Sequence, residues 1–160
     1  MGLEMIPAYG HREAIVTLFT EYTSMLMEQD EMVRQYLILQ NYQKEREHPE
    51  SKYGMPEGRL YLAYWEGQPA GCIGLRKLDE ARCELKRLYV RPEFRGHHIG
   101  EALIRRILDD AREIGYRHVL LDTLPFLRSA IRLYRAIGFY EIGCYNESPV
   151  ETTIFMQYDL

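Results

Sequence analysis

The sequence of 160 residues has little of several features that mark common protein classes. Its three cysteines, Cys72, Cys83 and Cys144, are odd in number and far apart, which argues against a disulfide framework and a zinc site. No run of about 18 apolar residues occurs, as a membrane-spanning helix would need. The first residues also lack the basic start and apolar run of a secretory signal. We therefore expect a cytoplasmic protein with no metal site and no membrane partner.

The chain also lacks an excess of positive charge. It carries 20 Lys and Arg against 24 Asp and Glu, a net charge of −4 at pH 7. A nucleic-acid binder needs a basic face to neutralise phosphates, so this balance predicts no nucleic-acid partner. Hydrophobic residues make up 46% of the chain, and 160 residues is a usual size for one core. We expect a single domain over residues 1–160.

Hydrophobic periodicity predicts a mixture of strands and helices. Apolar residues at steps of three and four indicate helices over His11–Leu26, Met32–Tyr42, Gly100–Ile114 and Leu127–Ile137. Short apolar or alternating runs indicate strands over Leu3–Pro7, Arg59–Trp65, Ala70–Lys77, Arg82–Val90, Val119–Leu121, Phe139–Cys144 and Thr152–Asp159. Glu45–Gly58 is polar and rich in Pro and Gly, which predicts a loop. This order of elements predicts an α/β sheet with helices on its faces.

One segment between a predicted strand and a predicted helix carries chemistry: Arg95–Gly100, which reads Arg-Gly-His-His-Ile-Gly. The first turn of a helix leaves its amides without partners, and the helix dipole adds positive potential there. Gly96 and Gly100 allow a phosphate to approach the backbone, and Arg95 adds a planar charge. The segment is neither a P-loop, because Glu101 follows Gly100, nor a dinucleotide-binding Gly-x-Gly-x-x-Gly. It predicts an anion site at a helix start.

Two further blocks accompany this segment. Leu88–Pro92 before it reads Leu-Tyr-Val-Arg-Pro, and Ala130–Phe139 after it reads Ala-Ile-Arg-Leu-Tyr-Arg-Ala-Ile-Gly-Phe. Together they resemble the GCN5-related N-acetyltransferases (GNAT), whose central motif is Arg/Gln-x-x-Gly-x-Gly/Ala. The resemblance implies an α/β (α+β) fold, a mixed and mostly antiparallel sheet of six to seven strands flanked by about four helices. The sequence departs from the pattern at His98, which replaces the first motif glycine, and at Leu127, where asparagine is common.

The resemblance also implies roles for individual residues. Glu84 is the candidate general base, and the phenol of Tyr134 is placed to protonate or hydrogen-bond the departing thiolate. Strand alternation predicts that Glu84 lies on one face with Lys86, Leu88 and Val90. The cofactor-binding residues that it implies are Leu88, Tyr89, Val90, Arg95, Gly96, His97, His98, Ile99 and Gly100.

Plainer roles stay open for three of these positions. Glu84 forms an ion pair with Lys86 or Arg87 in one alternative, and Tyr134 is a core tyrosine in another. Asp122, at the end of a predicted strand, is expected to accept cap or turn hydrogen bonds rather than to act as a base.

The function that the resemblance implies is transfer of an acetyl group from acetyl-CoA, the cosubstrate, to a primary amine of a small molecule or peptide. The transfer would occur by direct attack in a ternary complex, without a metal. Members of the family are often dimers, which allows a homodimer. The alternative function is a CoA-binding sensor or interaction module without catalysis.

Overall fold

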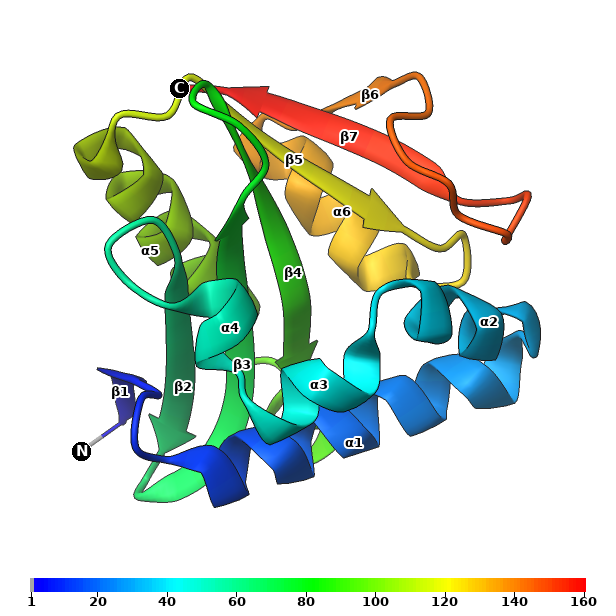
Figure 1. Ribbon diagram of the computed structural model, residues 1–160. Coiled ribbons are helices and arrows are strands. Elements are labelled where there is room, and N and C mark those ends of the chain that lie inside the picture. The colour runs from blue at the N-terminus through cyan, green and yellow to red at the C-terminus, as the bar shows by residue number, and fades with distance from the viewer. Residues whose placement is uncertain (1) are drawn as a thin grey trace.

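Figure 1 shows the fold as a computed structural model, in which residues 2–160 are described. Within these residues a seven-stranded sheet has the order β1-β2-β3-β4-β5-β7-β6. The strands are β1 (Leu3–Pro7), β2 (Arg59–Trp65), β3 (Gln68–Lys77), β4 (Arg82–Val90), β5 (His118–Thr123), β6 (Tyr140–Ile142) and β7 (Ile154–Asp159). The helices are α1 (Arg12–Gln29), α2 (Met32–Leu39), α3 (Tyr42–Glu47), α4 (Glu50–Tyr53), α5 (Ile99–Ile114) and α6 (Arg128–Ile137), with a 3-10 turn η1 at Pro92–Phe94.

The sheet is mixed and mostly antiparallel. Strands β4 and β5 pair parallel, and the other neighbouring strands pair antiparallel. Helices α5 and α6 pack on one face through residues such as Leu103 and Tyr134. Helices α1 and α4 cover the other face through Ile15 and Tyr53, with α2 and α3 beside α1 (Figure 1). The predicted fold class is confirmed. In the part of the chain described, no helix is both long and apolar enough to span a membrane.

One predicted loop is wrong. The segment Glu45–Gly58 contains the end of α3 and all of α4. Its polar residues are not all solvated, because Glu45 is buried against Arg87. Tyr53 is fully buried and lies so close to Gly74 that a Cβ there would be 2.8 Å from the tyrosine ring. Partners that lie far along the chain stabilise these short helices, and local sequence pattern does not reveal them.

Most other predicted elements are present with shifted ends. The helix predicted over Met32–Tyr42 ends at Leu39, because Asn41 adopts a left-handed conformation with φ 55° and a new helix follows. Strand β6 is shorter than the predicted Phe139–Cys144, whereas β4 has its predicted bounds, Arg82–Val90.

Strand β4 changes face at Arg87. This residue has φ 60°, and the pairing with β3 shifts its register opposite it, which marks a β-bulge. Before the bulge, Glu84 and Lys86 point toward the α2 side of the sheet, and Lys86 lies over a tyrosine ring of α2. After it, Leu88 and Val90 pack against the core beneath α5. The prediction that all four share one face is therefore wrong, because the bulge reverses the alternation.

The two parallel strands separate soon after they meet. Pairing between β4 and β5 runs from Arg82 to Glu84, and beyond that point the strands diverge, as Figure 1 shows. The carboxyl-terminal part of β4, which includes Leu88 and Val90, therefore borders an opening between the two halves of the sheet.

Candidate functional site

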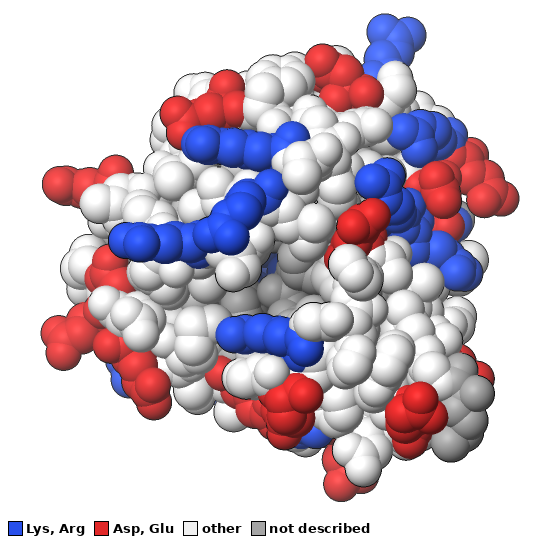
Figure 2. Space-filling view, turned by 180° about the vertical axis from the view of Figure 1, so that it is seen from behind, with Lys and Arg blue, Asp and Glu red and all other residues white. Residues whose placement is uncertain are grey.

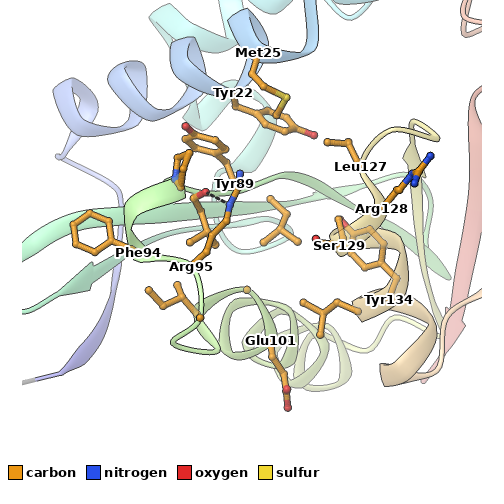
Figure 3. A pocket seen from close by; sticks show the side chains of 18 of the residues that line it. Tyr22, Met25, Tyr89, Phe94, Arg95, Glu101, Leu127, Arg128, Ser129 and Tyr134 are labelled. Atoms are coloured by element: carbon orange, nitrogen blue, oxygen red, sulfur yellow. Dashed lines mark hydrogen bonds between the residues drawn. The ribbon is translucent and has the colours of Figure 1, made fainter. Parts of the chain in front are cut away.

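A cleft of about 610 Å³ lies at this opening. The end of β4, the starts of α5 and α6 and one face of α1 form its walls (Figure 3). The molecule is hollowed near the middle of the face shown in Figure 2, and several Lys and Arg side chains stand around the hollow. The cleft is lined by Tyr22, Met25, Gln29, Leu88, Tyr89, Val90, Pro92, Phe94, Arg95, Gly96, His98, Ile99, Gly100, Glu101, Phe126, Leu127, Arg128, Ser129, Ala130, Leu133 and Tyr134.

The start of α5 presents free backbone amides to the cleft. The first hydrogen bond of this helix runs from the amide of Ala102 to the carbonyl of His98, over 3.1 Å. Within residues 2–160, the amides of residues 96–101 donate to no protein acceptor. The only acidic side chain in the lining, Glu101, pairs with Arg105 at 3.0 Å and points away from the cleft in Figure 3. Free amides at a helix start, together with the helix dipole, favour the binding of an anion.

Gly100 keeps the helix start close to α6. A Cβ at this position would lie 3.3 Å from Cδ2 of Leu133, tighter than an ordinary contact. Arg95, at the other end of the segment, donates from Nε to the Val90 carbonyl over 3.3 Å and holds the loop against β4 (Figure 3). The residues present fit the pyrophosphate of CoA, because free amides and a guanidinium meet at one narrow turn.

Not every residue of the predicted cradle directs its side chain into the cleft. The ring of His97 stacks on Trp65 of β2, with centroids 4.1 Å apart and planes 16° from parallel, so this side chain ties the loop to the sheet. The side chain of Tyr89 donates a hydrogen bond to Glu21 of α1 at 3.2 Å and contacts the Tyr22 ring. The other seven predicted cofactor-binding residues line the cleft, and so does Tyr89.

His98 occupies a backbone conformation that suits glycine. Its φ of 60° and ψ of 25° lie in the left-handed region, which costs a non-glycine residue about 1–2 kcal/mol. A His98→Gly variant removes this strain but makes the unfolded chain more flexible, at a cost of about 0.5–1 kcal/mol. We expect a net stabilisation of up to about 1 kcal/mol, measured by urea unfolding.

The matched control for this variant is the neighbouring residue. His97 has no positive φ among the residues described, and its ring stacks on Trp65, so His97→Gly is expected to destabilise the protein. If His98→Gly lowers the free energy of unfolding as much as His97→Gly does, the left-handed residue carries no strain.

Two phenols line the inner end of the cleft. Tyr134 comes from α6 and Tyr22 from α1 (Figure 3). Within the described part of the chain neither hydroxyl has a hydrogen-bond partner, and since no fully enclosed polar atom lacks one, both border open space. Burial raises the pKa of Tyr22 to about 12 and the pKa of Tyr134 well above its usual 10. Both groups are therefore protonated hydrogen-bond donors at neutral pH.

Glu84 is not among the residues that line the cleft; it lies beside Lys86 on the α2 side of the sheet. It is 1% exposed. One carboxylate oxygen accepts a hydrogen bond from Nε of Arg76 at 2.7 Å, and the other accepts one from the hydroxyl of Tyr145. Of the two ion pairs predicted from sequence, the structure contains the one with Lys86, at 3.9 Å. Arg87 instead pairs with Glu45 of α3 at 2.7 Å.

A half-buried carboxylate, Asp122, completes a polar cluster that sequence reasoning missed. It accepts hydrogen bonds from the Tyr36 hydroxyl of α2 and from Nδ2 of Asn146, the latter at 2.8 Å. The expectation that it caps a turn is therefore wrong. Burial disfavours its charge, but Lys86 and these two hydrogen bonds outweigh burial and keep the pKa of Asp122 below its usual 3.8.

The polar cluster comprises Tyr36, Glu84, Lys86, Asp122, Tyr145 and Asn146. It adjoins the cleft, because Tyr36 packs against the same apolar cluster as Tyr22, Met25 and Leu127 of the cleft lining. Its members come from α2, β4, β5 and the loop before β7, up to 110 positions apart. Among residues 2–160, no group of three or more His, Cys, Asp or Glu is placed to hold a metal ion.

Known proteins resemble this chain in both sequence and fold. The sequence profile of the acetyltransferase (GNAT) family matches residues 17–139. An uncharacterised N-acetyltransferase of Schizosaccharomyces pombe is 36% identical over 126 residues, which cover 78% of this chain and 77% of that protein.

Two crystal structures extend the likeness. An acetyltransferase of Streptococcus agalactiae has a TM-score of 0.80 at 20% identity, over 100% of this chain and 99% of the other, and so has the same fold. A GNAT family acetyltransferase of Elizabethkingia anophelis with acetyl-CoA bound has a TM-score of 0.55 at 23% identity, over 65% and 77% of the two chains. With its motif blocks, its mixed sheet and a profile match across most of its length, this chain belongs to the GNAT family of N-acetyltransferases.

Proposed function

We propose that this protein transfers the acetyl group of acetyl-CoA to a primary amine, with residues 1–160 acting as one N-acetyltransferase domain. The observation that carries the proposal is the arrangement of the cleft. Free amides at the start of α5 form its anion-binding part, and an unpaired, protonated phenol, Tyr134, stands at its inner end. An anion site and a proton donor in one cleft suit a phosphate-bearing thioester substrate.

The residues that would hold acetyl-CoA line the cleft in order. Backbone groups of Leu88 and Val90, after the bulge, are placed to pair with the pantetheine arm as an added strand. The amides of residues 96–100, with Arg95, would hold the pyrophosphate. Acetyl-CoA supplies the activated acetyl thioester.

The proposed chemistry uses two side chains. A C–N bond forms to the acceptor amine as the C–S bond breaks, and the electron pair of that bond leaves with the sulfur. Tyr134 donates a proton to this sulfur, and the Glu84 carboxylate accepts the proton that the amine loses. The position of Glu84 in the polar cluster supports this role. A homodimer stays a prediction.

Acetyl-CoA binding tests the first half of the proposal. A ligand that binds the native state raises its stability by mass action, by about 2.7 kcal/mol at a hundred times Kd. We expect millimolar acetyl-CoA to raise the melting temperature of the wild type and to leave Gly100→Val unshifted, because the new side chain would meet Leu133. Gly143→Val is the matched control, since a Cβ at that glycine has nothing within 4 Å. No shift in the folded wild type would refute the proposal.

Thiol release in the presence of amines tests the second half. The proposed enzyme releases free CoA thiol in proportion to added amine, and the acetylated product is detected by mass spectrometry. Binding of acetyl-CoA without thiol release across a broad amine panel would instead identify a CoA-binding module without catalysis.

A further inference from the structure

Lys86 of β4 is a buried cation without a hydrogen bond. Its side chain is 4% exposed. The nearest carboxylate oxygen, Oε1 of Glu84, is 3.9 Å from its Nζ, beyond hydrogen-bond distance, and the centroid of the Tyr36 ring is 5.9 Å away. Within residues 2–160 its ammonium donates to no protein acceptor, and no fully enclosed side-chain nitrogen or oxygen is left unpaired. The ammonium therefore borders open space.

Arg87, the next residue along β4, is a buried cation whose partners all lie within the chain. The side chain of Arg87 is 6% exposed, and its guanidinium donates to both oxygens of Glu45 and to Oε1 of Gln40, at 2.6–3.0 Å. An ammonium has three donors, and burying it without partners is costly. The difference between Arg87 and Lys86 indicates that Lys86, whose one ion pair within residues 2–160 is the 3.9 Å contact with Glu84, can take a hydrogen-bond partner from outside the chain.

The charges around Lys86 are also out of balance. Glu45 is neutralised twice, by Arg87 at 2.7 Å and by Lys52 at 2.8 Å. Glu84 is already paired with Arg76 at 2.7 Å. Four cations thus share three carboxylates, which leaves one positive charge in excess. These seven residues are Lys52, Arg76, Lys86, Arg87, Glu45, Glu84 and Asp122.

Lys86 also lies near the place where the acceptor must arrive. Its ammonium lies over the ring of Tyr36, which packs against the same apolar cluster as Tyr22 and Leu127 of the cleft lining. The hydrogen bond from Asn146 to Tyr36, at 2.7 Å, joins the loop before β7 to α2 over this cluster. Because the Lys86 side chain is 4% exposed, only a small molecule can reach its ammonium.

We propose that Lys86 binds a carboxylate of the acceptor, and that the acceptor is a small amino acid, an amine that carries its own carboxylate. The proposal rests on the proposed acetyltransferase function. Lys86 supplies the missing partner for the anionic end, and the two carboxylates of the cluster, Glu84 and Asp122, suit the ammonium end. The carboxylate of the acceptor thus gives Lys86 the hydrogen-bond partner that it lacks among residues 2–160.

Matched pairs of acceptors test this inference. The common L-amino acids are compared with their amides, which keep the amine and side chain but lose the carboxylate. The amides have the less basic amine and are the better free nucleophiles at neutral pH, so nucleophilicity does not favour the acids. For the wild type we expect kcat/KM at least about tenfold higher for the best acid than for its amide, as for one charged hydrogen bond.

Variants of Lys86 test whether this residue causes the preference for the acids over their amides. Lys86→Met keeps the length of the side chain and removes its charge, so KM for the acid should rise about 10–100-fold, and by more than KM for the amide. Lys86→Arg should restore part of the preference. Lys77→Met is the control, because this lysine is the last residue of β3 and pairs with Glu80 on the surface.

The outcomes separate this inference from the proposed function. Equal kcat/KM for acids and amides in the wild type would overturn the role of Lys86 while leaving the acetyltransferase intact. If Lys86→Met does not fold, the comparison of kcat/KM for acids and amides in the wild type still tests the inference. The melting-temperature shift with acetyl-CoA shows whether the variant is folded. Thiol release with no amine at all would instead refute the proposed function.

Discussion

Replacing Glu45 by alanine is expected to destabilise the protein by about 3–5 kcal/mol, the usual cost of breaking a buried ion pair from one side. Glu45 is 1% exposed. It accepts hydrogen bonds from Arg87 at 2.7 Å, from Lys52 at 2.8 Å and from the Tyr53 hydroxyl at 2.9 Å. Without it, the buried guanidinium of Arg87 loses its counterion at the β4 bulge. Urea unfolding at neutral pH measures the loss.

The control for Glu45→Ala lies on the same helix. Glu47 is exposed and receives a side-chain hydrogen bond from Gln43 at 3.0 Å, so Glu47→Ala should change the free energy of unfolding by about 0.5 kcal/mol or less. Equal effects of the two substitutions would show that the buried network does not stabilise the fold.

The same carboxylate gives a pH dependence of known sign. Burial alone would raise the pKa of Glu45, but the charge and hydrogen bonds of Arg87 and Lys52 outweigh burial and lower it from 4.5 to about 2. A depressed pKa contributes stability above pH 4.5 that is lost as the pH falls from there toward 2. At about 1.4 kcal/mol per unit, this group contributes on the order of 3 kcal/mol. Wild-type stability should therefore fall over this range more steeply than that of any folded Glu45→Gln variant.

The local sequence pattern predicted most helices and strands but not the contacts between residues far apart in the chain. The strand Arg82–Val90 has its predicted bounds because Pro92 and the preceding turn limit it on both sides. The helices around Glu45 were missed because the buried partner, Arg87, is 42 positions away. The bulge at Arg87 was missed for the same reason, since nothing in the residue type requires a left-handed conformation.

The sequence likewise predicted one part of the candidate site and not the other. The segment Arg95–Gly100 was found because a strand, a glycine turn and a helix are consecutive in the chain, so one short motif describes the whole cradle. The polar cluster was not found. Asp122 meets Tyr36 across 86 positions and Asn146 across 24, so only the folded chain brings the three together. The free ammonium of Lys86 is likewise a property of its surroundings and not of its sequence neighbours.

The Tyr134→Phe variant is expected to lower kcat by about a hundredfold with little change in KM for acetyl-CoA, the usual size of a lost proton donor. The hydroxyl faces the cleft without a protein partner within the described residues. Because burial raises the pKa of Tyr134 well above 10, the donor stays protonated from pH 5 to 10, and this group gives the wild type no alkaline loss of kcat in that range.

Stability separates this role from a packing role. The ring of Tyr134 packs against Phe139, with centroids 5.5 Å apart, and phenylalanine keeps that contact. Among residues 2–160 the lost hydroxyl has no hydrogen-bond partner, so its removal should leave the melting temperature unchanged or slightly higher. Tyr140→Phe, on exposed β6, is the control and should keep wild-type kcat, although its hydroxyl pairs with Asp159 at 2.8 Å. If Tyr134→Phe retains kcat within twofold of the wild type, Tyr134 is a packing residue and the proton for the thiolate comes from another group, with Tyr22 the next candidate at the inner end of the cleft.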